Sequence, residues 1–257
     1  MRGAVATRFT IALLLFALAQ CAQAAVLTVL VEPYPPFVTE AAGGKLSGPY
    51  IDAFAQLAHH RGVEPAMQSM PVRRALLMAQ KAPGTCVLAI NYSAADAEVL
   101  LYLGRITPIY VWAYARHGDG TRASSLADLK QYSVGLSDIA EVRQMMDAAS
   151  LHYDVLQQST RGLQMLQARR FDILVSDIGP ELAAKSAGAS LDRLFTVARV
   201  ERWLACNPNT DPATLAALHA ALKEGLFAED VRDVWSKYGM ADYFAQVRKE
   251  WSATAKP

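Results

Sequence analysis

The sequence predicts an α/β protein in which parallel sheets are covered by helices and divided between two similar lobes. Short, continuously apolar segments, typical of buried parallel strands, alternate with segments whose apolar residues recur at helical spacing. Such alternation indicates parallel sheets flanked by helices. The pattern restarts after the turn-rich stretch at 117–125. About 230 residues are enough for two small domains, so the restart favours two lobes in close contact.

The first 24 residues have the pattern of a cleavable export signal. Arg2 and Arg8 precede or flank an apolar run, and the small-residue pattern Ala-Gln-Ala at 22–24 follows it. The run is shorter than the roughly 20 residues that a membrane-spanning helix needs. We therefore expect cleavage after position 24 and a periplasmic mature chain. A retained lipid on Cys21 is the alternative.

The charge balance argues against nucleic acid and anionic membranes as partners. Loss of Arg2 and Arg8 with the signal lowers the basic side chains from 25 to 23, against 24 acidic ones, a net charge of −1. Both kinds of partner attract a strong basic excess, which this chain lacks. No Cys/His cluster has zinc-site spacing and no glycine-rich phosphate loop is present, so we expect no metal or cofactor.

Two cysteines, Cys86 and Cys206, remain after removal of the signal. An oxidising compartment permits a disulfide. Two distant cysteines offer no spacing pattern, however, and free cysteines are often small buried hydrophobes. The sequence favours the unpaired, buried form.

Each predicted element rests on apolar periodicity bounded by turn or capping residues. In the first half we expect a strand at 26–31, helices at 51–58 and 73–81, a strand at 86–90 and an extended segment at 110–115. In the second half we expect a helical turn at 125–129, strands at 132–136, 153–156 and 171–176, a helix at 141–149, a helix capped by Thr160, a helix from Pro180, strands at 195–200 and 202–206, and helices from Asp211 onward.

Three prolines shape the loop after the first strand. Pro33, Pro35 and Pro36 fix their own φ angles and hold the preceding residues extended, so the loop cannot continue a helix or pair inside a sheet. The loop therefore presents Tyr34 and Phe37 beyond the end of the strand.

Ligands of open α/β sheets bind outside the carboxyl ends of the strands. Four such ends can be read from the sequence: residues 32–37, 91–93, 137–138 and 176–177. We expect Tyr34 and Phe37 to form an aromatic wall of a ligand site, with Tyr92 and Ser93 at a neighbouring strand end. Packing of Phe37 into a lobe core is the alternative.

Several motifs, in order along the chain, carry a resemblance to a known family. They are Tyr34-Pro35-Pro36-Phe37, Gly44 to Gly48 followed by Asp52, Ser125 to Leu129 followed by Val134-Gly135, and Leu166, Arg170, Asp172, Val175 and Asp177. Together they resemble the family 3 periplasmic solute-binding proteins, which capture polar amino acids for ABC importers. The resemblance covers essentially the whole mature chain.

The resemblance implies a type II periplasmic-binding-protein fold. Two lobes, each a mostly parallel sheet flanked by helices, would be joined by two crossing strands that act as a hinge. Residues 25–110 and 210–257 would form the first lobe and 111–209 the second. Cys86 and Cys206 would then lie in different lobes, which argues further against a disulfide.

The resemblance also points to ligand contacts. Asp177 matches the aspartate that binds the ligand's amino group in this family. The position of the family's carboxylate-binding arginine holds Asp96, and the anion-binding helix start of the second lobe holds Ser137 and Asp138. Two positions that usually bind an anion thus carry acids.

Two interpretations of this pattern remain open. In the first, the ligand is cationic or neutral and is held by Asp177 and by cation–π contacts with aromatic side chains. In the second, another arginine binds a carboxylate, since arginine suits bidentate carboxylate recognition. Arg74, in a segment similar to one in a branch of the family, is the first candidate. Arg161, near a helix start, is the second.

The function implied is capture of a small polar solute between two lobes by hinge closure, by a monomer that delivers it to an ABC permease. A periplasmic sensor or accessory protein without a transporter is the alternative. An enzyme, such as a dehydratase on the same fold with Glu32 or Asp96 as acid–base, is less favoured, because the sequence holds no recognisable catalytic motif.

Overall fold

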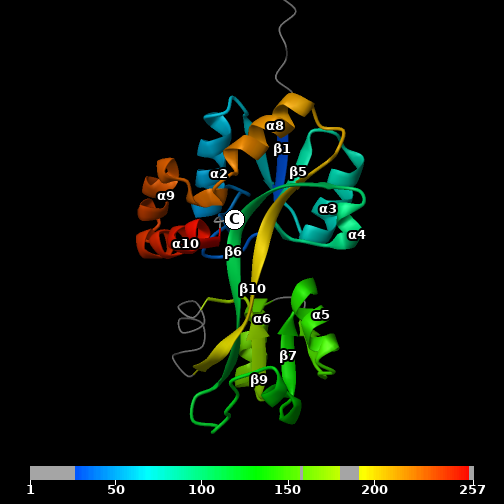
Figure 1. The fold of residues 1–257 in the computed structure, drawn as a ribbon, viewed down its shortest axis with the longest axis vertical. Coiled ribbons are helices and arrows are strands. Elements are labelled where there is room, and N and C mark those ends of the chain that lie inside the picture. Colours follow the sequence, from blue (N-terminus) through cyan, green and yellow to red (C-terminus); the bar gives the residue numbers. More distant parts are fainter. Residues whose placement is uncertain (1–26, 157–158, 180–190, 255–257) are drawn as a thin grey trace, which may run out of the picture.

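The computed structural model describes residues 27–156, 159–179 and 191–254 (Figure 1). The export signal, the possible lipid site at Cys21 and the helix expected from Pro180 lie outside these residues. Two bodies, one above the other in Figure 1, are joined by two long strands that run through both. None of the helices in the described ranges is both long and apolar enough to cross a membrane.

Among the described residues, eight strands form one continuous sheet, in the order β4-β1-β5-β10-β6-β9-β7-β8. The central strands β6 (Leu101–Arg116) and β10 (Leu191–Cys206) have 16 residues each and pair antiparallel. At about 3.3 Å per residue, such a strand is roughly 50 Å long and can run through both lobes. The last residues of β10, from Arg202 to Cys206, pair with β5. The last residues of β6, from Trp112 to Ala115, pair with β9. The predicted two-lobed α/β fold with crossing strands is confirmed.

The first lobe is built around β1 (Leu27–Val31), which lies parallel between β4 (Pro65–Ser69) and β5 (Thr85–Asn91). Its core includes Phe54, from the first quarter of the chain, and Trp235, from near its end. Its other elements are β2 (Thr39–Glu40), β3 (Leu46–Ser47), α2 (Pro49–His59), α3 (Val72–Lys81), α4 (Ala94–Ala97), α8 (Pro212–Ala221), η2 (Gly225–Phe227), η3 (Glu229–Val231), α9 (Arg232–Lys237) and α10 (Ala241–Thr254).

The second lobe repeats this plan on a smaller scale. β7 (Val134–Ser137) lies parallel between β8 (Asp154–Leu156) and β9 (Ile173–Ser176). Its helices are η1 (Ala127–Gln131), α5 (Ala140–Ala148) and α6 (Ser159–Gln167). Because α6 begins at Ser159, Thr160 lies inside the helix and not at the predicted capping position before it.

The central strands are longer than the sequence pattern predicts. The extended segment expected at 110–115 is the second half of β6, and the two strands expected at 195–200 and 202–206 are one strand, β10. Gly104 and Pro108 interrupt the strand pattern of β6. The pairing of β6 with β10 shifts register at several points, and such bulges let a strand accommodate a proline that lacks an N–H group.

The two cysteines form a disulfide, so the expectation that they are unpaired is wrong. Cys86 of β5 and Cys206 of β10 are register partners, both are fully buried, and their sulfur atoms are 2.05 Å apart. Both belong to the first hydrophobic core, although Cys206 was expected in the second lobe. The error arises because β10 crosses back into the first lobe before it ends, which brings together residues 120 positions apart.

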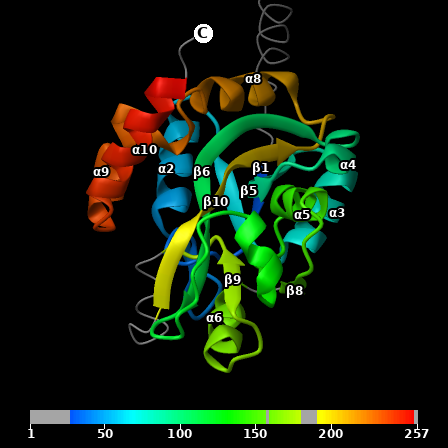
Figure 2. The ribbon, with the colours of Figure 1, turned by 60° about the horizontal axis from the view of Figure 1, so that its bottom comes forward.

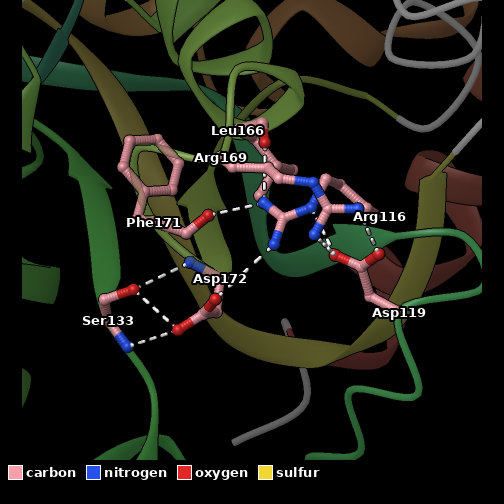
Figure 3. Close-up of polar contacts among 7 residues, drawn as sticks. All are labelled: Arg116, Asp119, Ser133, Leu166, Arg169, Phe171 and Asp172. Atoms are coloured by element: carbon pink, nitrogen blue, oxygen red, sulfur yellow. Dashed lines mark hydrogen bonds and ion pairs between the residues drawn. The ribbon is translucent and has the colours of Figure 1, made fainter.

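Arg116, at the end of β6, organises an ion-pair network at the far end of the second lobe (Figure 3). Its guanidinium donates to two backbone carbonyl oxygens, at 2.6 and 2.7 Å, and pairs with Asp119 and Asp172. Asp172 accepts hydrogen bonds from the hydroxyl and backbone N–H of Ser133, which lower the pKa of its carboxyl group. A cavity of about 380 Å³ lies beside this network. Because Ser133 and Asp172 precede β7 and β9, the network lies at the amino ends of these strands, away from the end where ligands bind.

Removing the disulfide should destabilise the first lobe. Substitution of both Cys86 and Cys206 by alanine is expected to lower the free energy of unfolding by about 2–5 kcal/mol, because the bond closes a long loop in the unfolded chain. Urea unfolding of the two proteins gives this difference. Thiol titration of the unreduced, denatured wild-type mature chain should find no free thiol, and detection of two free thiols would contradict the assignment.

Candidate functional site

The carboxyl ends of strands from both lobes face each other between the lobes. The loop at 32–38 follows β1, and Asn91 ends β5 in the first lobe. In the second lobe, Ser137 ends β7 and Asp177 follows β9. Helix α5 of the second lobe lies on the same side of the molecule as α3 and α4 of the first lobe (Figures 1 and 2). The lobes therefore meet at the edge where α/β sheets bind ligands.

A buried ion pair between Asp177 and Arg202 lies at this boundary. Asp177 is 5% exposed, and its Oδ2 is 2.9 Å from Nη2 of Arg202. The same guanidinium donates to the side-chain oxygen of Asn91, which is the register partner of Arg202 in the pairing of β10 with β5. Removing a charge pair from water is costly unless further hydrogen bonds satisfy it, and Asn91 provides one. Arg202 thus links the first lobe to the second.

Tyr34 reaches the same point from the proline loop. Its hydroxyl donates to the backbone carbonyl oxygen of Asp177 at 2.9 Å, and its ring centre is 5.7 Å from the guanidinium carbon of Arg202. Burial, followed by the nearby Asp177 carboxylate, raises the pKa of Tyr34 well above its usual value. The phenol is therefore a neutral donor, and its ring face can interact with a cation.

Phe37 lies between Tyr34 and the core of the first lobe. Its ring is stacked 5.7 Å from the ring of Tyr34 and 4.7 Å from that of the buried Tyr50, and it packs against the first hydrophobic core. This packing corresponds to the alternative interpretation of Phe37. A direct ligand contact by Phe37 stays a prediction.

A second ion pair joins the lobes at Asp138. Its carboxylate is 3.8 Å from Arg73 of α3 in the first lobe and 3.4 Å from Arg143 of α5. The N-cap residue of α5 is Ile139, so Asp138 does not cap the helix. Ser137 is buried, and its hydroxyl is hydrogen-bonded to Ser176 at 2.9 Å. The negative charge of Asp138 is balanced by two arginines, so it opposes a bound anion less than the sequence suggests.

Tyr92, Ser93 and Asp96 lie together at the end of β5. Tyr92 is 44% exposed, and its ring contacts Tyr102 at 5.0 Å between centroids. Ser93 caps α4 by accepting a hydrogen bond from the backbone N–H of Asp96. Burial and then the charge of Asp96 raise the pKa of Tyr102 to about 12. This cluster is aromatic and acidic, a combination that suits a cation better than an anion.

The remaining candidates lie on helix surfaces. Arg74 is exposed in the first turn of α3, and Arg161 is exposed in the first turn of α6. Glu32, a possible acid–base residue, accepts a hydrogen bond from the backbone N–H of Val72 at the start of α3. A carboxylate contact by Arg74 or Arg161 stays a prediction. Among the described residues, no group of three or more His, Cys, Asp or Glu side chains could hold a metal ion.

Sequence reasoning missed Arg202, Asn91 as its partner, and Arg73. The sequence does contain a feature that points to Arg202. The charged pair Glu201-Arg202 stands between the apolar residue Val200 and the apolar segment 203–206 of the same strand. A charged residue that is kept in a strand paired on both sides needs a partner. The identity of that partner depends on the crossing of β10, which the sequence does not reveal.

Comparisons with known proteins bear on the fold. No known family model and no curated protein matches the chain. The structure is similar to an ancestral arginine-binding protein bound to arginine, with a TM-score of 0.66 and 19% identity, over 83% of this chain and 98% of that one. An ancestral arginine-binding protein bound to glutamine has a TM-score of 0.61 and 20% identity, over 86% and 96% of the two chains. A histidine kinase sensor domain with similarity to periplasmic binding proteins has a TM-score of 0.65 and 17% identity, over 88% and 95%. The chain therefore has the two-lobed fold of the type II periplasmic binding proteins.

Proposed function

We propose that the protein binds a small polar, amino-acid-like solute between its two lobes by hinge closure. The observation that carries this proposal is the buried pair of Asp177 and Arg202, which lies where strand ends of both lobes converge. Two opposite charges and the ring of Tyr34 offer contacts to a polar solute with an ammonium or guanidinium group. Structures of similar fold were solved with arginine and with glutamine, which supports this solute class.

The mechanism follows from the connection between the lobes. Among the described segments, β6 and β10 pass from one lobe to the other, and two paired strands can bend as a hinge. Closure brings Asp177 and Asp138 of the second lobe to Arg202, Tyr34 and Arg73. A solute that contacts both lobes shifts the population toward the closed form.

Delivery of the solute to an ABC permease is our first proposal for the step after binding. The second candidate is a sensor that presents its closed form to a signalling partner. It is favoured by the similarity to a histidine kinase sensor domain, which extends over 88% of the chain. Export to the periplasm and action as a monomer belong to the same proposal. So do the lobe boundaries inferred from the sequence, except that the end of β10 with Cys206 belongs to the first lobe.

A thermal-shift panel of amino acids, agmatine, polyamines and dicarboxylates on residues 25–257 tests solute binding. A solute at 100 times its Kd should stabilise the protein by about 2.7 kcal/mol and raise the Tm by about 5–10 °C. The shift should disappear in Asp177→Asn, which removes one site charge, and persist in Asp172→Asn, a matched change at the far end of the second lobe. A panel without any shift, or equal shifts in both variants, would contradict the proposal.

The Tyr34→Phe substitution tests the closed form. The hydroxyl of Tyr34 bonds across the lobes, so its loss should cost the closed form about 0.5–1.5 kcal/mol and move the open–closed ratio about 2–10-fold toward open. Small-angle scattering of the solute-free protein should then give a larger radius of gyration. Tyr132→Phe is the control, because its hydroxyl bonds Arg122 within the second-lobe segment. If Tyr34→Phe and the control scatter alike, the Tyr34 contact does not influence closure.

A further inference from the structure

The guanidinium of Arg202 occupies the position where a cationic group of a solute would be expected. Its side chain is 14% exposed. It is held by the carboxylate of Asp177 at 2.9 Å, by the amide oxygen of Asn91, and by the ring face of Tyr34 at 5.7 Å. A carboxylate, an amide oxygen and an aromatic face are the groups with which proteins bind small cations.

These three groups come from elements other than β10. Asn91 ends β5, Asp177 follows β9, and Tyr34 belongs to the loop after β1. They form a site from both lobes, into which β10 inserts the side chain of Arg202. Asp177 follows β9, which pairs with β7 in the second lobe, whereas Asn91 and Arg202 are register partners in the paired strands β5 and β10. Separation of the lobes would therefore break the contact of Arg202 with Asp177 and keep its contact with Asn91.

We propose that Arg202 is an internal competitor for this cation position. In the absence of solute, its guanidinium binds Asp177 and holds the lobes together; a cationic group of a solute must displace it from that carboxylate. This inference rests on the proposed function in assuming that the solute brings a cation. The apparent affinity for simple cations is therefore the intrinsic affinity multiplied by the fraction of molecules in which Arg202 has left the site.

The competition also favours zwitterions over simple cations. A displaced Arg202 leaves a guanidinium that needs a new anionic partner, since an unpaired buried charge is costly. A solute that carries a carboxylate beside its cationic group supplies that partner and exchanges one ion pair for two. A decarboxylated solute supplies none. Arg202 thus acts as a residue that selects for the carboxylate.

The experiment uses the mature chain, the Arg202→Ala variant and a matched pair of solutes, arginine and agmatine, which differ by the carboxylate. In the wild type, arginine should bind at least tenfold more tightly than agmatine. In Arg202→Ala, agmatine should gain at least tenfold and the preference for arginine should collapse. Arg199→Ala, a change on the same strand in an arginine that pairs with Glu201, should keep the wild-type preference. If the Arg202→Ala variant loses affinity for both solutes equally, Arg202 is a structural residue and the inference is overturned.

A second probe separates this inference from the proposed function. Ethylguanidinium carries the atoms that Arg202→Ala removes, so it should bind that variant at about millimolar concentration, lower its radius of gyration and leave the wild type unchanged. This result would support the cation position even if neither arginine nor agmatine binds the wild type. A folded variant that ignores ethylguanidinium would overturn the inference even if amino acids bind the wild type.

The Arg202→Ala variant removes the arginine partner of Asp177 and can fail to fold. The Arg202→Lys variant then decides, because lysine keeps the charge but cannot bridge Asp177 and Asn91 as a planar guanidinium does. Agmatine and ethylguanidinium should displace the lysine more easily than the arginine, so both should bind this variant more tightly than the wild type. Binding no tighter than to the wild type would overturn the inference.

Discussion

The antiparallel pairing of β6 with β10 is the constraint on which the rest of the structure depends. These strands run through both lobes, carry β5 and β1 at one end, and carry β9 and β7 at the other. Because each lobe is completed by the same two strands, the carboxyl ends of the flanking parallel strands point toward one shared boundary. The site is therefore a consequence of the crossing, and the side chains that β10 contributes to it belong to both lobes.

The disulfide reinforces this arrangement near the site. Cys206 is bonded to Cys86, and four residues earlier on β10 Arg202 stands opposite Asn91 of the same strand β5. The pairing shifts register between Trp203 and Ala205, so the strands are not held by a regular ladder along this stretch. A covalent bond beyond the irregularity limits how far β10 can slide on β5. The guanidinium of Arg202 consequently remains in reach of Asn91.

Local patterns predicted most elements, because apolar periodicity and turn residues report on short-range structure. The sequence led to the proline loop, to Tyr34 and to Asp177, since each follows a strand that can be recognised locally. It did not lead to the disulfide or to Arg202, because both depend on the return of β10 into the first lobe. Gly104 and Pro108 interrupt the strand pattern, so the sequence predicts only the second half of β6. The first half of β6, with which the end of β10 pairs, was therefore not recognised. Residues whose role depends on long-range pairing are those that local reasoning cannot assign.

Under the proposed function, the charges between the lobes would favour selectivity over strong binding. Asp138 is balanced by Arg73 and Arg143, and Asp177 by Arg202, so the boundary already holds paired charges before a solute arrives. A polar solute bound as proposed would exchange one set of charge-assisted hydrogen bonds for another, and the net gain would be the difference between two similar energies. Small mismatches, such as a missing carboxylate, therefore change a large part of that difference. A boundary with unpaired charges would attract more solutes but would cost more to close when empty, because each buried charge would lack a partner.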